Sequence, residues 1–490
     1  MIEEKSKAIN KLIHFPRVMI AAERSGCGKT TFTCGLLQLL KNRGLKPVSF
    51  KCGPDYIDPM FHEKVLGVPS TNLDPYFLDS DIPDENRLKS LLKDRAADGN
   101  CGVIEGVMGI YDGIYVDSDK FSSYEVSIKT DTNIILMVNG RGAVRTLISV
   151  IKGILADDRD NKIKGIILNQ LSEGMYQRIK PVLENEINAA GFDARVVGFL
   201  PKNDEISISS RYLGLSLPGE IQGLQEQINL MADMIENYVD VDSILEIMES
   251  SGMQEAASVL DKQDNEQESL SKNHESMTKS KSIINLAVAK DEAFCFYYKE
   301  NIEAFEKRGV NIIYFSPLKD KRLPDGISGL LLGGGYPEQY ARELSDNKSM
   351  LESVKEVLDN GLPCIAECGG FMYLHKSIRT KDGDEYQMVG ALDAAAEYTG
   401  HLVRFGYFNV SQIVCQENNF QGLVGMKGHE FHYFDSTDNG GDALLEKTST
   451  GKKYSAMMID GRRVLGYPHL YYNSSPKFVD EFIEVMKGEN

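Results

Sequence analysis

The sequence lacks the features that mark membrane, secreted and nucleic-acid-binding proteins. It has no run of about 18 apolar residues, which a membrane-spanning helix would need. The opening stretch MIEEKSKAINKLIHFPR has no apolar segment of the signal-peptide type. Basic residues are in the minority: 54 Lys and Arg against 72 Asp and Glu give a net charge of −18, whereas nucleic-acid surfaces usually carry a basic stripe. We therefore expect a cytoplasmic protein acting on small molecules, with neither a membrane nor nucleic acid as a partner.

Cysteine is present, but not in metal-binding or disulfide patterns. None of the 8 cysteines forms a Cys-x-x-Cys pair, which argues against a structural zinc site. Scattered thiols in a large chain are typical of a reducing compartment.

With 490 residues, the chain is too long for one hydrophobic core and is expected to hold at least two domains. Short β-type runs alternate with helical stretches, first from RVMIAA (17–22) to ARVVGFLP (194–201) and again from IINLAVAK (283–290). Near-continuous apolar strands that alternate with helices predict an α/β fold with a mostly parallel sheet in each half. From about Gly406 the pattern becomes more antiparallel.

A polar stretch separates the two halves and follows a predicted helix around 224–249. Within DKQDNEQESLSKNHESMTKSKS (261–282) only Leu270 and Met277 are apolar, so the segment predicts a linker; a solvated helical extension is the alternative. The predicted organisation is an N-terminal extension over 1–16, a first domain over 17–250, a polar linker over 251–282 and a second domain over 283–490.

The stretch AERSGCGKTT (22–31) lies between a predicted strand and a predicted helix, the setting of a phosphate-binding loop. Glycines let backbone N–H groups close around phosphate, the lysine reaches the β- and γ-phosphates, and the first threonine offers its hydroxyl to Mg²⁺. A capped helix with an incidental Gly-Lys-Thr is the alternative. Glu23 stands where the common G-x-x-x-x-G-K-[ST] pattern has its first glycine. The predicted ATP-binding residues are Gly26, Gly28, Lys29, Thr30 and Thr31.

Two further strand ends carry acidic residues. FKCGPDYIDPMFH (50–62) contains Lys51, Asp55 and Asp58, and VIEGVMGIYDG (103–113) contains Glu105 and Asp112. Ligands of open α/β sheets bind at the carboxyl ends of strands, where a carboxylate can hold Mg²⁺ or position a substrate. A polar turn is the alternative for the first string, since its Pro and Asp residues favour turns.

CIAECGGFMYL (364–374) places Cys368 where a strand gives way to a helix, in outline a nucleophile elbow. Gly369 after it, and Gly334 and Gly335 in LLGGGYPE, are suited to bind an oxyanion through their backbone N–H groups. A buried inert thiol is the alternative, which we expect for Cys364 inside the strand. A thiol nucleophile needs a base. The candidate bases are His401, His429, His432 and His469.

Taken together, the strings FKCGPDYIDPMFH, NLDPYFL, VIEGVMGIYDG, LLGGGYPE, AECGGFMYL and GHEFHY resemble the cobyrinic acid a,c-diamide synthase family. The resemblance runs in order over nearly the whole chain except the N-terminal extension and the linker. It implies an N-terminal phosphate-loop domain of the dethiobiotin-synthetase type and a C-terminal class I glutamine amidotransferase domain. Members carry out two glutamine-dependent amidations in cobalamin biosynthesis.

The resemblance also implies roles in the second domain. Cys368 would hydrolyse glutamine with His469 as its base; other class I enzymes have His-Pro-Glu here. Because Leu470 and Tyr471 follow His469, a dyad without the orienting Glu is predicted. His432 stays open as an alternative base, and the roles of His401 and His429 stay open.

In the first domain, ATP would phosphorylate the a and c acetate groups of cobyrinate, and ammonia from L-glutamine would displace phosphate. Thr30, Asp55 and Glu105 are the expected Mg²⁺ ligands; Lys51, Asp55, Asp58 and Asp112 are expected to bind substrate. Because free ammonia is mostly protonated at neutral pH, we expect an internal path for ammonia from Cys368 to these acidic residues. The nickel-sirohydrochlorin a,c-diamide synthase and, from another class, a non-enzymatic partition ATPase are the alternatives. The macrocycle metal, the order of amidation and the oligomeric state, including a homodimer, stay open.

The resemblance places the family's first loop glycine at Ala22 rather than at Glu23. Alanine does not readily adopt a positive φ, so the backbone at Ala22 must be compatible with a Cβ.

Overall fold

The structure, a computed structural model, describes residues 14–79, 86–206, 218–252, 283–415 and 419–488. The chain divides into two compact units, unit 1 (residues 1–279) and unit 2 (residues 280–490), and each is described by itself. Residues 1–13 of the predicted extension and 253–282 of the predicted linker lie outside the described residues.

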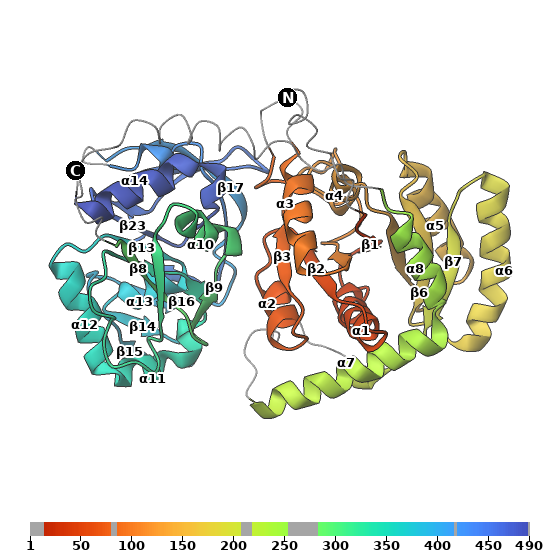
Figure 1. The fold of residues 1–490 in the computed structure, drawn as a ribbon, viewed down its shortest axis with the longest axis horizontal. Helices are drawn as coiled ribbons and strands as arrows, with labels where there is room; N and C mark the ends of the chain where they lie inside the picture. Colours follow the sequence, from red (N-terminus) through yellow and green to blue (C-terminus); the bar gives the residue numbers. More distant parts are fainter. Residues whose placement is uncertain (1–13, 80–85, 207–217, 253–282, 416–418, 489–490) are drawn as a thin grey trace, which may run out of the picture. The chain divides into compact units, whose positions relative to one another are not determined.

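Unit 1 is built on a seven-stranded sheet with strand order β3-β2-β4-β1-β5-β6-β7 (Figure 1). Every neighbouring pair is parallel, and most strand residues are buried, which explains their continuous apolar runs. The predicted α/β class is confirmed. The strands are β1 Arg17–Ala22, β2 Pro47–Cys52, β3 Ser70–Leu73, β4 Cys101–Glu105, β5 Ile134–Asn139, β6 Ile163–Asn169 and β7 Arg195–Leu200.

Helices connect these strands, and α1 packs against α7 in the main core of the unit. The stretch read from sequence as one helix around 224–249 is two, because the chain turns at Asp240. The Asp240 side chain accepts a hydrogen bond from the backbone nitrogen of Ser243 at 3.0 Å and caps α8. The helices are α1 Lys29–Asn42, α2 Ile57–Lys64, α3 Arg87–Arg95, α4 Ser123–Thr130, α5 Arg145–Asp157, α6 Glu173–Ala190, α7 Pro218–Tyr238 and α8 Val241–Glu249.

The strand order sets the position of the first site. The chain runs from β1 to β2 on one side of the sheet and later to β5 on the other, so the topology switches direction at β1. The loops after β1, β2 and β4 leave adjacent carboxyl ends, where open α/β sheets bind ligands.

Unit 2 contains a six-stranded sheet and a five-stranded antiparallel sheet, with orders β10-β8-β11-β13-β23-β22 and β21-β20-β17-β18-β24. In the first sheet only β22 runs antiparallel to its neighbour. The strands are β8 Asn285–Ala289, β10 Asn311–Phe315, β11 Gly329–Leu332, β13 Cys364–Glu367, β17 Arg404–Ile413, β18 Lys427–His432, β20 Ala443–Lys447, β21 Lys453–Ala456, β22 Met458–Ile459, β23 Arg463–Gly466 and β24 His469–Leu470.

Smaller elements complete unit 2. A short ribbon joins β9 Phe294–Phe296 to β12 Gly334–Gly335, and β15-β14-β16-β19 form a four-stranded sheet. The remaining bounds are β14 Ser377–Arg379, β15 Glu385–Gln387, β16 Ala395–Tyr398, β19 Phe434–Ser436, α10 Lys299–Glu306, α11 Ala341–Asp346, α12 Lys348–Asp359, α13 Gly369–Leu374 and α14 Pro476–Lys487.

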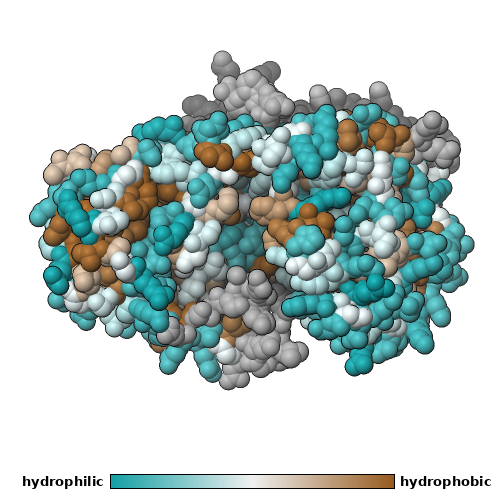
Figure 2. Space-filling view, turned by 180° about the vertical axis from the view of Figure 1, so that it is seen from behind, coloured by the Kyte–Doolittle hydropathy of each residue, from teal (hydrophilic) through white to brown (hydrophobic). Residues whose placement is uncertain are grey.

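The face drawn in Figure 2 carries mostly hydrophilic residues, with the largest group of apolar ones at the left of the view. Among the helices of the described ranges, none is both long and apolar enough to cross a membrane.

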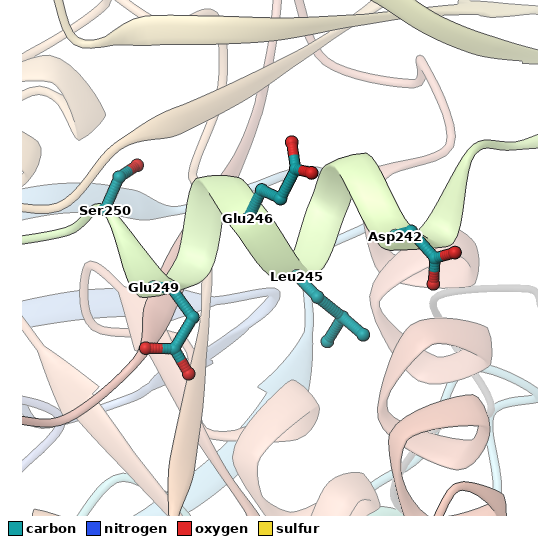
Figure 3. A pocket seen from close by; sticks show the side chains of 5 residues that line it. All are labelled: Asp242, Leu245, Glu246, Glu249 and Ser250. Carbon is teal, nitrogen blue, oxygen red and sulfur yellow. The ribbon is translucent and has the colours of Figure 1, made fainter.

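A shallow pocket lies on α8, lined by Asp242, Leu245, Glu246, Glu249 and Ser250 (Figure 3). Each of its three acids has a basic partner: Arg43 lies 3.3 Å from Asp242, Arg195 2.7 Å from Glu246 and His14 2.6 Å from Glu249. Because one helix lines it and its charges are paired, this pocket offers no convergent set of groups for chemistry.

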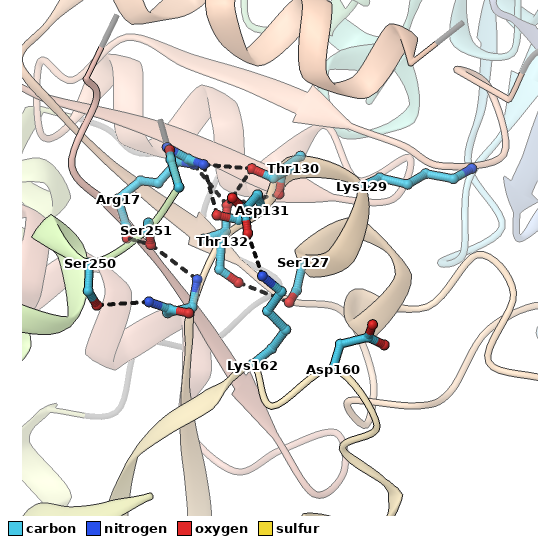
Figure 4. A network of polar contacts seen from close by, with 12 residues as sticks. Arg17, Ser127, Lys129, Thr130, Asp131, Thr132, Asp160, Lys162, Ser250 and Ser251 are labelled. Carbon is cyan, nitrogen blue, oxygen red and sulfur yellow. Dashed lines mark hydrogen bonds and ion pairs between the residues drawn. The ribbon is translucent and has the colours of Figure 1, made fainter. Parts of the chain in front are cut away.

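Arg17, the first residue of β1, joins the beginning of unit 1 to its last described residues (Figure 4). Its fully buried guanidinium donates to the hydroxyl of Thr132 at 3.0 Å and to four carbonyl oxygens. One of these belongs to Gly252, at 3.0 Å, and the hydroxyl of Ser251 donates to the Arg17 carbonyl at 2.7 Å. A buried cation therefore ties β1, the α4–β5 turn and the end of α8 together.

Candidate active site

The phosphate loop follows β1 and runs into α1 in unit 1. Gly26 (φ 76°) and Gly28 (φ 91°) have left-handed backbones that favour glycine. Asn169, at the end of β6, donates from Nδ2 to the carbonyl of Cys27 at 2.7 Å. A Cβ on Gly28 would lie only 2.7 Å from the same Nδ2. A distant strand therefore braces the loop, a role that the local sequence of β6 does not indicate.

Ala22 and Glu23 do not disturb the loop. Ala22 is the last residue of β1 and pairs with Met137 of β5 in extended backbone, where a Cβ fits without strain. Glu23 turns its side chain inward: its Oε1 accepts a hydrogen bond from the backbone nitrogen of Asn139 at 3.1 Å, and only 9 % of the side chain is exposed. Glu23 thus attaches the start of the loop to β5, whereas the Arg24 side chain is exposed.

The first two residues of α1 face the end of β4. Lys29 donates from Nζ to the carbonyl oxygens of Met108 at 2.5 Å and Arg24 at 3.3 Å. Burial, with the charge of Lys51, lowers the pKa of Lys29. The Thr30 hydroxyl donates to Oε1 of Glu105 at 2.5 Å. Thr31 follows, half-buried, in the same turn.

Lys51 lies between two carboxylates, one in α2 and one at the end of β4. Its Nζ forms ion pairs with Asp58 and, at 2.7 Å, with Oε1 of Glu105. Burial alone would lower the pKa of Lys51, but Asp58 and Glu105 raise it well above its ordinary value. Burial raises the pKa of Glu105 to about 7 and that of Asp55 to about 6, each with a contribution from Asp58. The structure therefore brings Thr30, Lys51, Asp58 and Glu105 together.

Two predicted residues make local contacts instead. Asp55 accepts a hydrogen bond from the backbone nitrogen of Ile57 at 2.8 Å, within the turn after β2. Asp112 is exposed, and its Oδ2 accepts from the backbone nitrogen of Gly109 at 2.9 Å. Asn72 of β3 donates to the carbonyls of Gly53 and Asp55 at 2.8 Å and so positions this turn.

The residues fit a magnesium ion held jointly with phosphate. Within the described part of the chain, no three His, Cys, Asp or Glu side chains form a metal-binding group by themselves. Mg²⁺ typically takes one or two carboxylates and completes its shell with phosphate and water. Glu105 is fully buried beside Thr30, and its Oε2 has no hydrogen-bond partner among the described residues. The Thr30 hydroxyl and Glu105 can therefore serve such an ion.

Cys368 forms a strained elbow in unit 2. It follows β13 directly and precedes α13, with φ 47° and ψ −104°. A non-glycine residue with positive φ at a strand-to-helix turn is typical of a nucleophile elbow. A Cβ on Gly370 would lie 2.1 Å from the carbonyl oxygen of Leu332, so α13 needs glycine to approach β11. Burial raises the pKa of the Cys368 thiol, which therefore needs a base for activation.

The predicted oxyanion donors lie close to one another. An ideal Cβ on Gly369 would lie 3.0 Å from the backbone nitrogen of Gly335. One on Gly334 would lie 2.4 Å from Cε1 of His469. The glycine-rich end of β11, the elbow and His469 therefore converge, although they are far apart in sequence.

The four histidines have different surroundings. The His469 ring stacks on His429 with centroids 5.1 Å apart, whereas His432 stacks on Tyr467 at 4.1 Å. Burial lowers the pKa of His469, with contributions from His429 and His432, so it carries the neutral imidazole that a general base needs. His432 lies with Nδ1 2.6 Å from the carbonyl of Phe434, and His401 is exposed. Of His469 and His432, His469 is the ring that adjoins the glycine-rich end of β11, at Gly334.

Comparison with known proteins identifies the family. Residues 18–213 match the CobQ/CobB/MinD/ParA nucleotide binding domain, and residues 285–476 match the CobB/CobQ-like glutamine amidotransferase domain. A cobyrinate a,c-diamide synthase from Clostridium acetobutylicum is 39% identical over 471 residues, covering 95% of this chain and 99% of that protein. One from Caldanaerobacter subterraneus is 35% identical over 470 residues, covering 95% and 97%. The chain belongs to the cobyrinate a,c-diamide synthase family. Like its family, it is a glutamine-dependent amidoligase with a phosphate-loop nucleotide-binding domain, which confirms the resemblance seen in the sequence motifs.

Proposed function

We propose that this protein uses ATP and L-glutamine to convert the a and c acetate carboxylates of cobyrinate into amides. The observation that carries the proposal is the presence, in one chain, of a phosphate loop joined to Glu105 and a cysteine elbow beside His469. The relatives' names supply the substrate. We also propose the domain limits 17–250 and 283–490, joined by the polar linker 251–282.

In the glutaminase domain, the sulfur of Cys368 attacks the side-chain amide carbon of glutamine. His469 accepts the thiol proton and returns it to the departing ammonia, leaving a thioester. The N–H groups of Gly335 and Gly369 stabilise the oxyanion. Water, deprotonated by His469, then hydrolyses the thioester to glutamate and restores the thiol.

In the synthetase domain, an acetate oxygen of cobyrinate attacks the γ-phosphorus of ATP, giving an acyl phosphate and ADP. Ammonia attacks the acyl carbon, and phosphate leaves. The loop N–H groups and Lys29 hold the phosphates, with Gly26, Gly28 and Thr31 shaping the site. Mg²⁺, when held by Thr30 and Glu105 with Asp55 nearby, would neutralise charge on the transferring phosphoryl group. Lys51, Asp58 and Asp112 orient the substrate.

An enclosed path for ammonia from Cys368 to the acidic cluster is part of the proposal. Ammonia free in water at neutral pH is mostly protonated and no longer nucleophilic, so release beside the acceptor keeps it reactive.

Cys368→Ser tests the proposal. Glutamine-dependent amidation of cobyrinate should disappear, while amidation with added ammonium chloride survives, because only the ammonia source is removed. Cys415→Ser, at a half-buried thiol outside the sequence motifs, is the matched control and should retain both activities. Retained glutamine use in Cys368→Ser, or loss of both activities in a folded variant, would contradict the assignment.

Nickel-sirohydrochlorin remains the competing substrate. Parallel assays with cobyrinate and nickel-sirohydrochlorin, at equal ATP and ammonium concentrations, separate the two; faster amidation of nickel-sirohydrochlorin would refute the proposed substrate.

A further inference from the structure

We propose that Glu367 is a positioning residue that orients His469, so that the glutaminase site obtains its acid from the residue before the nucleophile. The inference rests on the proposed roles of Cys368 and His469. In class I enzymes with His-Pro-Glu, the acid follows two residues after the histidine. Here Tyr471 occupies that place; it is buried, and its ring packs edge-on against Tyr298.

The geometry brings Glu367 to the required nitrogen. Oε2 of Glu367 lies 3.9 Å from Nδ1 of His469, and both residues are buried, with 7 % and 3 % of their surfaces exposed. An N–H···O hydrogen bond is about 2.9 Å long, so an approach of about 1 Å would form one. Catalytic hydrogen bonds are often long before substrate binds and shorten in the complex.

Contacts from the His469 side hold the carboxyl group in place. The hydroxyl of Tyr472 donates to Oε1 of Glu367 at 2.9 Å, and the backbone of Leu470 also forms a hydrogen bond with the carboxyl. Oε1 is therefore engaged by Tyr472, whereas Oε2 is the oxygen nearest His469. Leu470 and Tyr472 follow His469 closely in the sequence. One short segment therefore carries both the base and the groups that hold Glu367 beside it.

The ring of His469 is also constrained. The His429 ring stacks on it at an interplanar angle of 22°, and Gly334 lies against Cε1. A carboxyl oxygen that accepts a hydrogen bond from Nδ1 selects the tautomer with the proton on Nδ1 and leaves Nε2 unprotonated. Nε2 is then the atom that accepts the thiol proton of Cys368, and the imidazolium formed carries its positive charge beside Glu367.

The other nearby carboxylate is already engaged. Glu430 forms an ion pair with Arg404 at 3.4 Å, lies 3.6 Å from Nε2 of His432 and accepts a hydrogen bond from Tyr454. The charges of His429, His432 and Glu430 act on the pKa of His469. Glu367 is thus the carboxyl group placed for the base.

The test compares Glu367→Gln, Glu367→Asp and Tyr472→Phe with the parent enzyme. Glu367→Gln keeps the shape but removes the ionisable carboxyl group. We expect kcat for glutamine hydrolysis to fall by at least about 10-fold, with KM for glutamine nearly constant. The rising limb of kcat/KM against pH should move to lower pH, because an amide, unlike the carboxyl group, cannot ionise beside the imidazolium and stabilise it. Ammonia-dependent amidation should not change.

The other two variants separate orientation from a structural role. Glu367→Asp should restore part of the rate and the parent pH limb, and Tyr472→Phe should lower kcat modestly without moving the limb. A parent-like kcat and pH limb in Glu367→Gln, with Cys368→Ser inactive on glutamine, would overturn this inference alone. Glutamine hydrolysis by Cys368→Ser would overturn the proposed function itself. If Glu367→Gln fails to fold, a parent-like rate in both remaining variants overturns the inference, and the graded losses support it.

Discussion

Replacing Gly334 by alanine should disable glutamine hydrolysis while leaving the rest of the enzyme folded. An ideal Cβ at this position would lie 2.4 Å from Cε1 of His469 and 3.3 Å from both ring nitrogens. Ordinary contact begins at 3.4 Å, so the imidazole must move by about 1 Å. The ring cannot retreat freely, because it is buried and stacks on His429.

The expected loss follows from that displacement. A misplacement of about 1 Å at a reacting group costs about 100-fold in rate, which corresponds to about 3 kcal/mol of activation free energy. The backbone of Gly334 does not require positive φ, so alanine adds no backbone strain there. The effect should therefore fall on kcat for glutamine and not on ammonia-dependent amidation.

Glutamate release measures glutamine hydrolysis, amidation with added ammonium measures the synthetase reaction, and thermal unfolding measures whether the variant is folded. Gly441→Ala is the matched control, since a Cβ there meets nothing within 4 Å. If Gly334→Ala hydrolyses glutamine within about threefold of the parent rate, either the ring moves without cost or His469 is not the base.

Four further predictions concern stability and the first domain. Arg17→Met should lower the free energy of unfolding of unit 1, measured in urea, by about 3 kcal/mol or more, because buried carbonyls lose their donor. Arg24→Met, at an exposed side chain, should change that free energy little. Equal effects of the two substitutions would contradict this. Ala22→Gly should lower the free energy of unfolding by about 0.5–1 kcal/mol and leave KM for ATP unchanged. A lower KM would show that the loop needs glycine at this position. Lys51→Met should abolish amidation with either nitrogen source but keep glutamine hydrolysis, and amidation at the parent rate would refute its role. Burial raises the pKa of Glu367 from 4.5 to about 8, so its proton stabilises the folded state fully below pH 4.5, and this stabilisation is lost as the pH rises to about 8. Glu367→Gln should therefore gain stability relative to the parent as the pH rises over this range. A difference in unfolding free energy between variant and parent that stays constant with pH would contradict this.

Much of the fold could be predicted because its signals are local. Apolar strands buried on both faces, such as β1, are continuous runs in the sequence, and glycines beside Lys29 mark the phosphate loop. The strand Ser70–Leu73 was missed because STNL is short and polar, and its stability comes from pairing with β2. The break at Asp240 was missed because helical periodicity continues across it.

The candidate sites divide in the same way. Each sequence motif predicts which of its residues act as nucleophile, glycine turn or acid. It does not predict which of these residues contact one another in the folded chain. Asn169 contacts Cys27 of the phosphate loop, which precedes it by 142 positions in the sequence, and no local pattern marks such a partner. The roles assigned to these residues stay predictions until the variants are assayed.

The sequence by itself determined the α/β class, the family and the residue types available at each strand end, because motif spacing and apolar periodicity depend on neighbours along the chain. Only the tertiary structure decided that Thr30, Lys51 and Glu105 share one point, because strand order is set by the packing of the whole sheet. It also placed Glu367, and not a residue after His469, beside the imidazole, because β24 follows β23, whose last residue Gly466 pairs with Glu367 at the end of β13.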